Sequence, residues 1–181
     1  SSEKDLNIFN KAIIEPLYFD KRNKVEVKLD DKYEIVDFDF DNDMHLINAS
    51  EIINEDLGDF FKSDNIRKMA TFPSFSQGLC FFIKDTTNEE LIGVSISTYC
   101  KEVEEVDIDW MYIRKNYHRQ GIGSFMINET VRRSKDAKII RVSGKNEFYK
   151  RCGFIAKELW VWAAKPGYSF YAPAIQPNIL E

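Results

Sequence analysis

The sequence contains few residues of the types that build metal sites and disulfide frameworks. Its 181 residues include only three cysteines and two histidines, His45 and His118. The cysteines, Cys80, Cys100 and Cys152, are odd in number and far apart, and no Cys-x-x-Cys pair occurs. Neither a disulfide framework nor a structural zinc site is therefore indicated. We expect reduced thiols and no metal.

A long apolar run and a basic surface are also lacking. No stretch approaches the roughly 20 apolar residues that a membrane-spanning helix needs, and the opening SSEKDLNIFN is too polar for a signal peptide. The formal charge is −5, whereas a nucleic-acid surface requires a basic stripe. We expect a cytoplasmic protein that binds neither membrane nor nucleic acid. A cationic partner such as an amine suits the charge better.

The composition that is present indicates one well-packed domain. Hydrophobic residues make up 44% of the chain and aromatic residues 14%, which is typical of a protein with a buried core, and the length favours a single domain. Residues 1–32 are charged and mixed, with a proline at position 16, and we interpret them as an N-terminal extension or edge element. We assign residues 33–181 to the domain.

Hydrophobic periodicity predicts the elements of that domain. Alternating patterns indicate strands and helical spacing indicates helices. The expected strands cover residues 33–40, 78–85, 90–99, 104–113, 138–144 and 154–164. The expected helices cover residues 41–57, 58–70, 124–136 and 146–153. This order predicts an α/β domain with a mixed, mostly antiparallel sheet and helices on both faces.

The stretch YHRQGIGSFM, residues 117–126, combines two glycines with a preceding basic cluster and a following helix. A glycine turn between a strand and a helix suits an anion, because free N–H groups converge at the helix start. A Walker loop would need Lys and Ser/Thr after the second glycine, where Ser124 and Phe125 stand. A dinucleotide fingerprint would need Gly or Ala at Met126. A tight turn that binds nothing is the remaining structural alternative.

A different signature fits the same stretch. The run YIRKNYHRQGIGSFMI, followed by FYKRCGF, resembles the GCN5-related N-acetyltransferase (GNAT) superfamily, whose signature is Gln/Arg-x-x-Gly-x-Gly/Ala at a helix start and Tyr-x-x-x-Gly-Phe downstream. Gly121 and Gly123 match the first motif, and Tyr149, Gly153 and Phe154 match the second. His118 departs from it, because it occupies the usual Gln/Arg position. The resemblance implies the acyl-CoA N-acyltransferase fold of that superfamily.

The resemblance also implies that acetyl-coenzyme A (acetyl-CoA) is bound. Its pyrophosphate would lie on the backbone N–H groups of residues 119–124, and the pantetheine arm and thioester oxygen would meet the strand before the turn, with Met111 N–H as the oxyanion donor. Asn146 would replace an asparagine that many relatives carry at the position of Val142. The expected cofactor-binding residues are Met111, Ile113, His118, Arg119, Gln120, Gly121, Ile122, Gly123, Ser124, Asn146 and Tyr149.

Transfer to an amine requires one group that removes a proton and one that supplies it. The resemblance suggests a carboxylate base on the strand before the turn. Asp107 is the first choice by position and Asp109, nearer the thioester, the second. A period of two predicts that both share a face with Met111; a solvated acidic face is the structural alternative. Tyr149 matches the family tyrosine that protonates the leaving sulfur, although a packed aromatic residue would look the same.

The function expected from these residues is the direct transfer of an acetyl group from acetyl-CoA to a primary amine of a small molecule or peptide. The alternative is a non-catalytic module of the same fold that binds acyl-CoA as a sensor or interaction partner. That module would keep the glycine turn but have no use for Asp107 or Tyr149. The aromatic tail of residues 165–181 could line the acceptor pocket, form a homodimer interface or cover a sheet edge.

Overall fold

The computed structural model describes residues 10–20, 27–143, 147–157 and 160–164. A seven-stranded sheet forms the centre, with strand order β3-β4-β5-β6-β7-β2-β8. Every neighbouring pair is antiparallel except β6 and β7, which run parallel. The strands of this sheet are β2 (Pro16–Phe19), β3 (Tyr33–Asp37), β4 (Phe81–Asp85), β5 (Glu90–Cys100), β6 (Glu105–Ile113), β7 (Ile139–Ser143) and β8 (Phe154–Ala156). β1 (Asn10–Ile14) and β9 (Trp160–Ala164) pair separately as an antiparallel ribbon.

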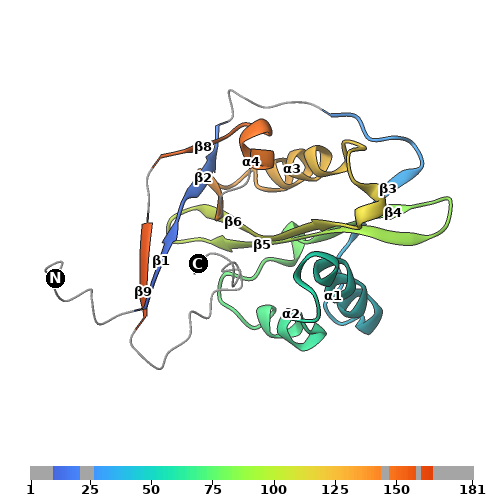
Figure 1. Cartoon of the computed structure of the whole chain (residues 1–181), viewed down its shortest axis with the longest axis horizontal. Helices are drawn as coiled ribbons and strands as arrows, with labels where there is room; N and C mark the ends of the chain where they lie inside the picture. Colours follow the sequence, from blue (N-terminus) through green and yellow to red (C-terminus); the bar gives the residue numbers. More distant parts are fainter. Residues whose placement is uncertain (1–9, 21–26, 144–146, 158–159, 165–181) are drawn as a thin grey trace, which may run out of the picture.

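Helices cover both faces of the sheet, as Figure 1 shows: α1 and α2 on one face, α3 and α4 on the other. The α-helices are α1 (Asp43–Leu57), α2 (Ser63–Met69), α3 (Ile122–Arg133) and α4 (Glu147–Arg151), and two 3₁₀ turns cover Gln77–Leu79 and Lys115–Tyr117. The predicted fold class, a mixed and mostly antiparallel sheet between helices, is confirmed.

Two layers of core hold the helices to the sheet. One cluster lies beneath α1 and α2 and includes Phe38, Phe82 and Trp110. The clusters on the opposite face include Ile127 of α3 and Phe154 of β8. Each fully buried large apolar side chain contributes roughly 1.5–3 kcal/mol to folding. The sheet is therefore held from both sides around β5 and β6, on which α1 and α3 both pack.

Some boundaries differ from the sequence predictions for identifiable reasons. The helix expected over residues 58–70 begins only at Ser63, because the Asn54 side chain bonds both the N–H and the carbonyl of Phe61 and holds the preceding residues in a loop. The strand expected over 154–164 is divided between β8 and β9. β2 lies between β7 and β8. Residues 16–19 are thus an interior strand, not an extension or edge element, and Pro16 is its first residue, where a missing N–H is tolerated.

Candidate active site

The second half of β6 lies beside β5 but not beside β7. β6 pairs with β7 from Glu105 to Ile108, whereas its pairing with β5 continues to Ile113. Arg114 N–H donates to the Ile92 carbonyl of β5 at 2.8 Å. Since backbone direction alternates along a strand, the N–H groups of Met111 and Ile113 point to the opposite side, where the pairing with β7 has ended; we call this half of β6, beyond its pairing with β7, the diverging half. These are the two backbones that the sequence predicted as cofactor contacts.

The turn after β6 presents a row of backbone N–H groups. Arg119 and Gly121 adopt left-handed φ angles of 62° and 79°, and α3 begins at Ile122. The first helical bond runs from Phe125 N–H to the Gly121 carbonyl at 3.0 Å. Within the described residues, no acceptor faces the N–H groups of residues 119–124. They add to the positive end of the α3 dipole, an arrangement that suits an anion.

The two glycines of the turn are required for different reasons. Gly121 precedes α3 with a φ of 79°, which costs a side-chain-bearing residue about 1–2 kcal/mol. Gly123 lies in the first turn of α3, where a Cβ would come within 2.8 Å of the Phe148 ring of α4 and 3.3 Å of Ile113. The first glycine therefore shapes the turn, and the second lets α4 pack against it.

Two side chains of the turn are bonded to neighbouring elements. The His118 ring contacts the Ile113 carbonyl through Nε2 at 2.8 Å, so Nε2 carries the hydrogen in this bond. The Tyr33 hydroxyl of β3 donates to Gln120 Oε1 at 2.6 Å. Although His118 departs from the family pattern, it joins the turn to the strand that would contact pantetheine. Arg119 is exposed beside them.

β6 contains a β-bulge in front of its diverging half. Ile96 of β5 faces Trp110, but the next residue, Ser97, faces Ile108. Asp109 is the extra residue, and such a bulge reverses the alternation of faces along the strand. Ile108 accordingly packs in the cluster with α3, whereas Trp110 packs beneath α1 and α2.

The expectation that both acidic residues share a face with Met111 is therefore wrong. Met111 packs against the clusters on the α3 side. Asp109 Oδ2 accepts from Thr98 Oγ1 at 2.9 Å, and Thr98 shares its face with Ile96, which lies beneath α1 and α2. Period-two counting failed because the bulge depends on pairing with β5, which the β6 sequence does not reveal.

The two carboxylates have different surroundings. Asp107 accepts two bonds of 2.6 Å from the Arg141 guanidinium of β7, and Arg141 also pairs with Glu105 at 3.0 Å. Asp109 has no ion pair among the described residues. Burial raises the pKa of Asp109 to about 7, and the negative charge of Asp107 adds to this rise, while Thr98 and Arg141 oppose it. Asp109 is thus the carboxylate that titrates near neutral pH.

Tyr149 lies in α4 and packs, partly buried, against the core on the α3 side. Its ring packs against Phe148 and Phe154 with centroids 5.3 and 5.6 Å away. Burial raises the pKa of its phenol, with smaller contributions from Tyr112 and Cys152. The phenol is therefore protonated at neutral pH. Cys152 contacts Ser124 at 3.6 Å between Sγ and Oγ, which links α4 to the start of α3.

Several expectations are not tested by these geometries. Asn146 lies outside the described residues, as does the aromatic tail. In the described part of the chain, no cluster of His, Cys, Asp or Glu could hold a metal ion. No helix there has the length and apolar content to cross a membrane.

Sequence reasoning missed three side chains of the site: Thr98, Arg141 and Tyr33. Arg141 had a signal, since it is the charged residue inside the apolar run IIRVS of a strand. Thr98 and Tyr33 had none, because they reach Asp109 and Gln120 only through the sheet pairing and the turn.

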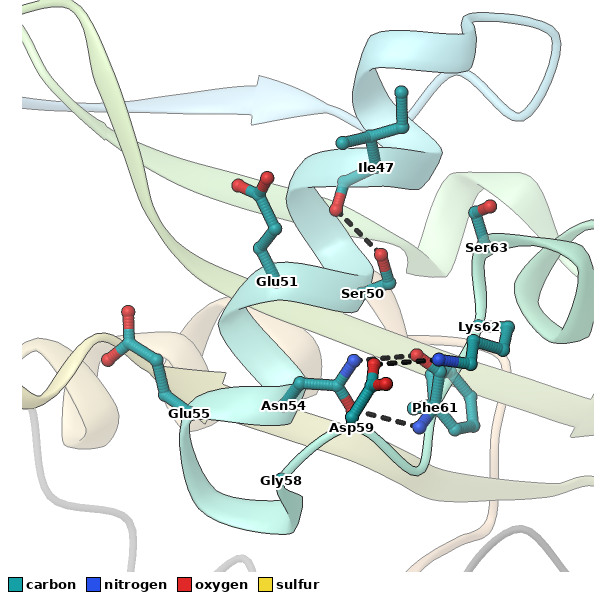
Figure 2. Close-up of a pocket in the computed structure, with 10 residues that line it drawn as sticks. All are labelled: Ile47, Ser50, Glu51, Asn54, Glu55, Gly58, Asp59, Phe61, Lys62 and Ser63. Atoms are coloured by element: carbon teal, nitrogen blue, oxygen red, sulfur yellow. Dashed lines mark hydrogen bonds and ion pairs between the residues drawn. The ribbon is translucent and has the colours of Figure 1, made fainter.

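A groove of about 580 Å³ lies elsewhere, between α1 and the loop that enters α2 (Figure 2). Glu51 and Glu55 extend from one side of α1, and Arg114 binds both of them. The Phe61 ring lines the groove and also packs on Trp110 at 4.4 Å. Residues of the glycine turn and of β6 do not line it. We therefore assign the candidate site to the diverging strand and the turn.

We compared the sequence with models of known protein families. Residues 76–156, from the approach to β4 through β8, match the model of the acetyltransferase (GNAT) domain. Residues 76–156 thus form an acetyltransferase (GNAT) domain. The match includes the diverging strand, the glycine turn and Tyr149, and it confirms the predicted family. A search among curated proteins gave no match.

Several solved structures share the fold at low sequence identity. A GCN5-related N-acetyltransferase from Sphaerobacter thermophilus aligns with a TM-score of 0.66 and 13% identity, covering 92% of this chain and 56% of that one. A GCN5-related N-acetyltransferase from Kribbella flavida aligns at 0.59 and 12%, covering 88% and 61%. Ard1 from Thermoplasma volcanium aligns at 0.57 and 14%, covering 70% and 85%. The chain thus spans little more than half the length of the first two proteins.

Proposed function

We propose that this GNAT domain transfers an acetyl group from acetyl-CoA directly to a primary amine of a small molecule or peptide. The observation that supports the proposal most strongly is the row of N–H groups at residues 119–124, which lie in a left-handed turn and at the start of α3. A diphosphate is the anion that such a row fits best, because several N–H donors can each bond a different phosphate oxygen. A net acidic protein needs a local donor site of this kind to hold a polyanion.

The diverging half of β6 then has a role in the transfer. Met111 and Ile113 N–H would bond the pantetheine arm and the thioester oxygen. Met111 N–H is the proposed oxyanion donor, which stabilises the charge that develops as the amine attacks the thioester carbon. Ile113 is the proposed pantetheine contact, and the His118 ring holds the neighbouring carbonyl in place.

Asp109 is the better candidate for the base. An attacking ammonium has a pKa of about 10 when it is lysine-like, and it must lose a proton before attack. A carboxylate with a pKa of about 7 accepts that proton more readily than one of ordinary acidity. Both oxygens of Asp107 are already bonded by Arg141. Asp107 therefore becomes the alternative base.

Tyr149 would supply the second proton. As a protonated phenol it can donate to the thiolate that leaves as coenzyme A. Its raised pKa makes this donation weak unless the phenol lies within hydrogen-bond reach of the sulfur. The acceptor is proposed to be cationic, in keeping with the carboxylates of Asp107 and Asp109 on β6.

The test combines binding and turnover. Calorimetry with acetyl-CoA and with free coenzyme A should show binding of both, and thiol release should depend on an added primary amine in a panel of small amines and peptides. The Asp109→Asn variant should bind coenzyme A normally and release little thiol. Tight binding without turnover on any amine would favour the non-catalytic acyl-CoA-binding module. Absence of binding would refute both functions.

A further inference from the structure

A row of polar side chains crosses the sheet at the point where β6 and β7 diverge. In the strand pairing, Thr98 of β5 faces Asp107 of β6, Asp107 faces Arg141 of β7, and Arg141 faces Tyr18 of β2. Four strands thus contribute neighbouring residues to one line. Asp109 joins this line from the bulge, because Thr98 donates to Asp109 although its register partner is Asp107.

The bonds within the row give the two acids different partners. Arg141 donates Nε–H to one oxygen of Asp107 and Nη2–H to the other. This bidentate pair fixes both the position and the orientation of a carboxylate. Arg141 and Asp107 are 16% and 27% exposed in their side chains, so water screens the pair only partly. Asp109 has a hydroxyl donor instead of a cation.

Resting on the proposed function, we propose that Arg141 is a positioning residue for proton transfer: by binding both oxygens of Asp107 it holds that acid on the β7 side and leaves Asp109 as the base. Without the guanidinium, two carboxylates on one face of β6 would share protons, and either could act. The ion pair thereby assigns the role of base to Asp109, and its two charges adjust in opposite directions a pKa that burial raises.

The charges that face Asp109 determine the direction of each expected change. On its own strand lies Asp107, whose negative charge favours the protonated form of Asp109; Arg141 of β7 favours the ionised form. The Cys80 thiol, just before β4, also lies near Asp109, but burial raises the pKa of that thiol to about 12 and keeps it neutral. Thr98 of β5 contributes a hydrogen bond without charge.

Opposite effects are therefore expected from the two halves of one ion pair. Arg141→Gln removes the positive charge, so the pKa of Asp109 should rise. The midpoint of the pH profile of kcat/KM should then move to higher pH by about one unit. Asp107→Asn removes the negative charge and keeps the guanidinium, so the pKa of Asp109 should fall. The midpoint of the pH profile of kcat/KM should then move to lower pH by a similar amount. The double variant should return near the wild-type midpoint. Arg141→Lys, which keeps the charge, should shift the midpoint least.

The experiment measures the midpoint in two ways. One is the pH profile of kcat/KM for acetyl transfer. The other is the NMR titration of the Asp109 carboxyl carbon in each protein without any substrate. Arg132→Gln is the matched control, since Arg132 binds both oxygens of Glu129 at 2.7 Å within α3, and it should shift neither midpoint. Circular dichroism establishes that each variant is folded.

The outcomes separate this inference from the function on which it rests. Opposite NMR shifts with no acetyl transfer in any protein would support the charge coupling and refute the function. Acetyl transfer with equal or same-direction shifts in the two single variants would refute the role of Arg141 and leave the function standing. If Arg141→Gln fails to fold, the comparison of Asp107→Asn with Arg141→Lys decides, and a downward shift in Asp107→Asn is then required.

Discussion

The two halves of β6 differ in what their backbones bond. From Glu105 to Ile108 the strand lies between β5 and β7 and bonds both, whereas from Asp109 to Ile113 only β5 pairs with it in the described part of the chain. The second half therefore presents N–H groups as an edge strand does, although it lies inside the sheet. A neighbour whose pairing ends partway along a strand is enough to leave backbone N–H groups unpaired in the middle of a sheet.

The bulge marks the border between these halves. Asp109 is the last residue before the freed backbone, and it is also the acid whose pKa burial raises to about 7. The first half of the strand contributes the carboxylate of Asp107, which is ion-paired with Arg141. The second half begins with one that has no cation. We therefore propose that the first half of β6 mainly supports the sheet and that the second half takes part in catalysis.

The largest effect should come from removing the acid at the border. Asp109→Asn should lower kcat by roughly 10²–10⁴-fold at pH 8, the range of general-base effects, while the Kd of coenzyme A stays unchanged. Steady-state kinetics and calorimetry measure the two quantities. Asp59→Asn, in the loop after α1, is the control because it changes the charge by the same amount. Its kcat should equal that of the wild type. If kcat is undiminished in Asp109→Asn, another residue is the base.

The second effect concerns a backbone group. Met111→Pro removes the N–H that points away from β5, and kcat should fall roughly 10²–10³-fold, as for an oxyanion donor. Met111→Ala controls for the lost side chain and should retain most activity. Tyr112→Pro removes an N–H directed toward β5 and should instead lower the melting temperature. If Met111→Pro and Met111→Ala are equally active, the donor is assigned wrongly.

A smaller effect is expected at the turn that follows the second half. Gly121→Ala introduces a Cβ with only an ordinary 3.5 Å contact to Val27, so its cost of about 1–2 kcal/mol arises from the φ of 79°. The distorted turn should weaken coenzyme A binding by roughly tenfold. Gly58→Ala is the control: Gly58 has a φ of 67° with a ψ of −152° and open space around it. That backbone is essentially restricted to glycine, so the variant should lose at least as much stability as Gly121→Ala and still bind coenzyme A normally. If Gly121→Ala binds coenzyme A as tightly as Gly58→Ala does, the turn is not part of the binding site.

The smallest effect should come from the link between turn and strand. His118→Ala removes the bond to the Ile113 carbonyl, a contact of about 0.5–1.5 kcal/mol, and should raise the Kd of coenzyme A several-fold. His45 offers a matched control, because its Nδ1 accepts from Asp39 N–H at 3.0 Å. His45→Ala should leave the Kd unchanged. A Kd that responds equally to both variants would contradict the linking role of His118.

The sequence predicted features that local patterns encode. Alternating runs and helical spacing located the main strands and helices, and the two glycines located the turn with its left-handed backbone. Tyr149 and its neighbours were found through a motif with fixed spacing. These features depend on residues close together in the chain, so one sequence is enough to recognise them.

Features that depend on distant pairing could not be predicted. The bulge at Asp109 exists only relative to β5, and the alternation of VDIDW contains no sign of it. The contact of Arg141 with Asp107 depends on the parallel register of two strands that are joined through α3. Insertion of β2 between β7 and β8 brings residues from opposite ends of the chain together. Each of these is a long-range choice that local preference does not determine.

The most direct test of the account is an amide NMR titration of the protein with coenzyme A. We predict that the resonances of residues 119–124 and the N–H groups of Met111 and Ile113 shift strongly, whereas those of Tyr112 and Arg114, which point toward β5, shift little. Uniform shifts along β6, or unchanged amides in the turn, would contradict the claim that the freed backbone of β6 and the start of α3 bind the cofactor together.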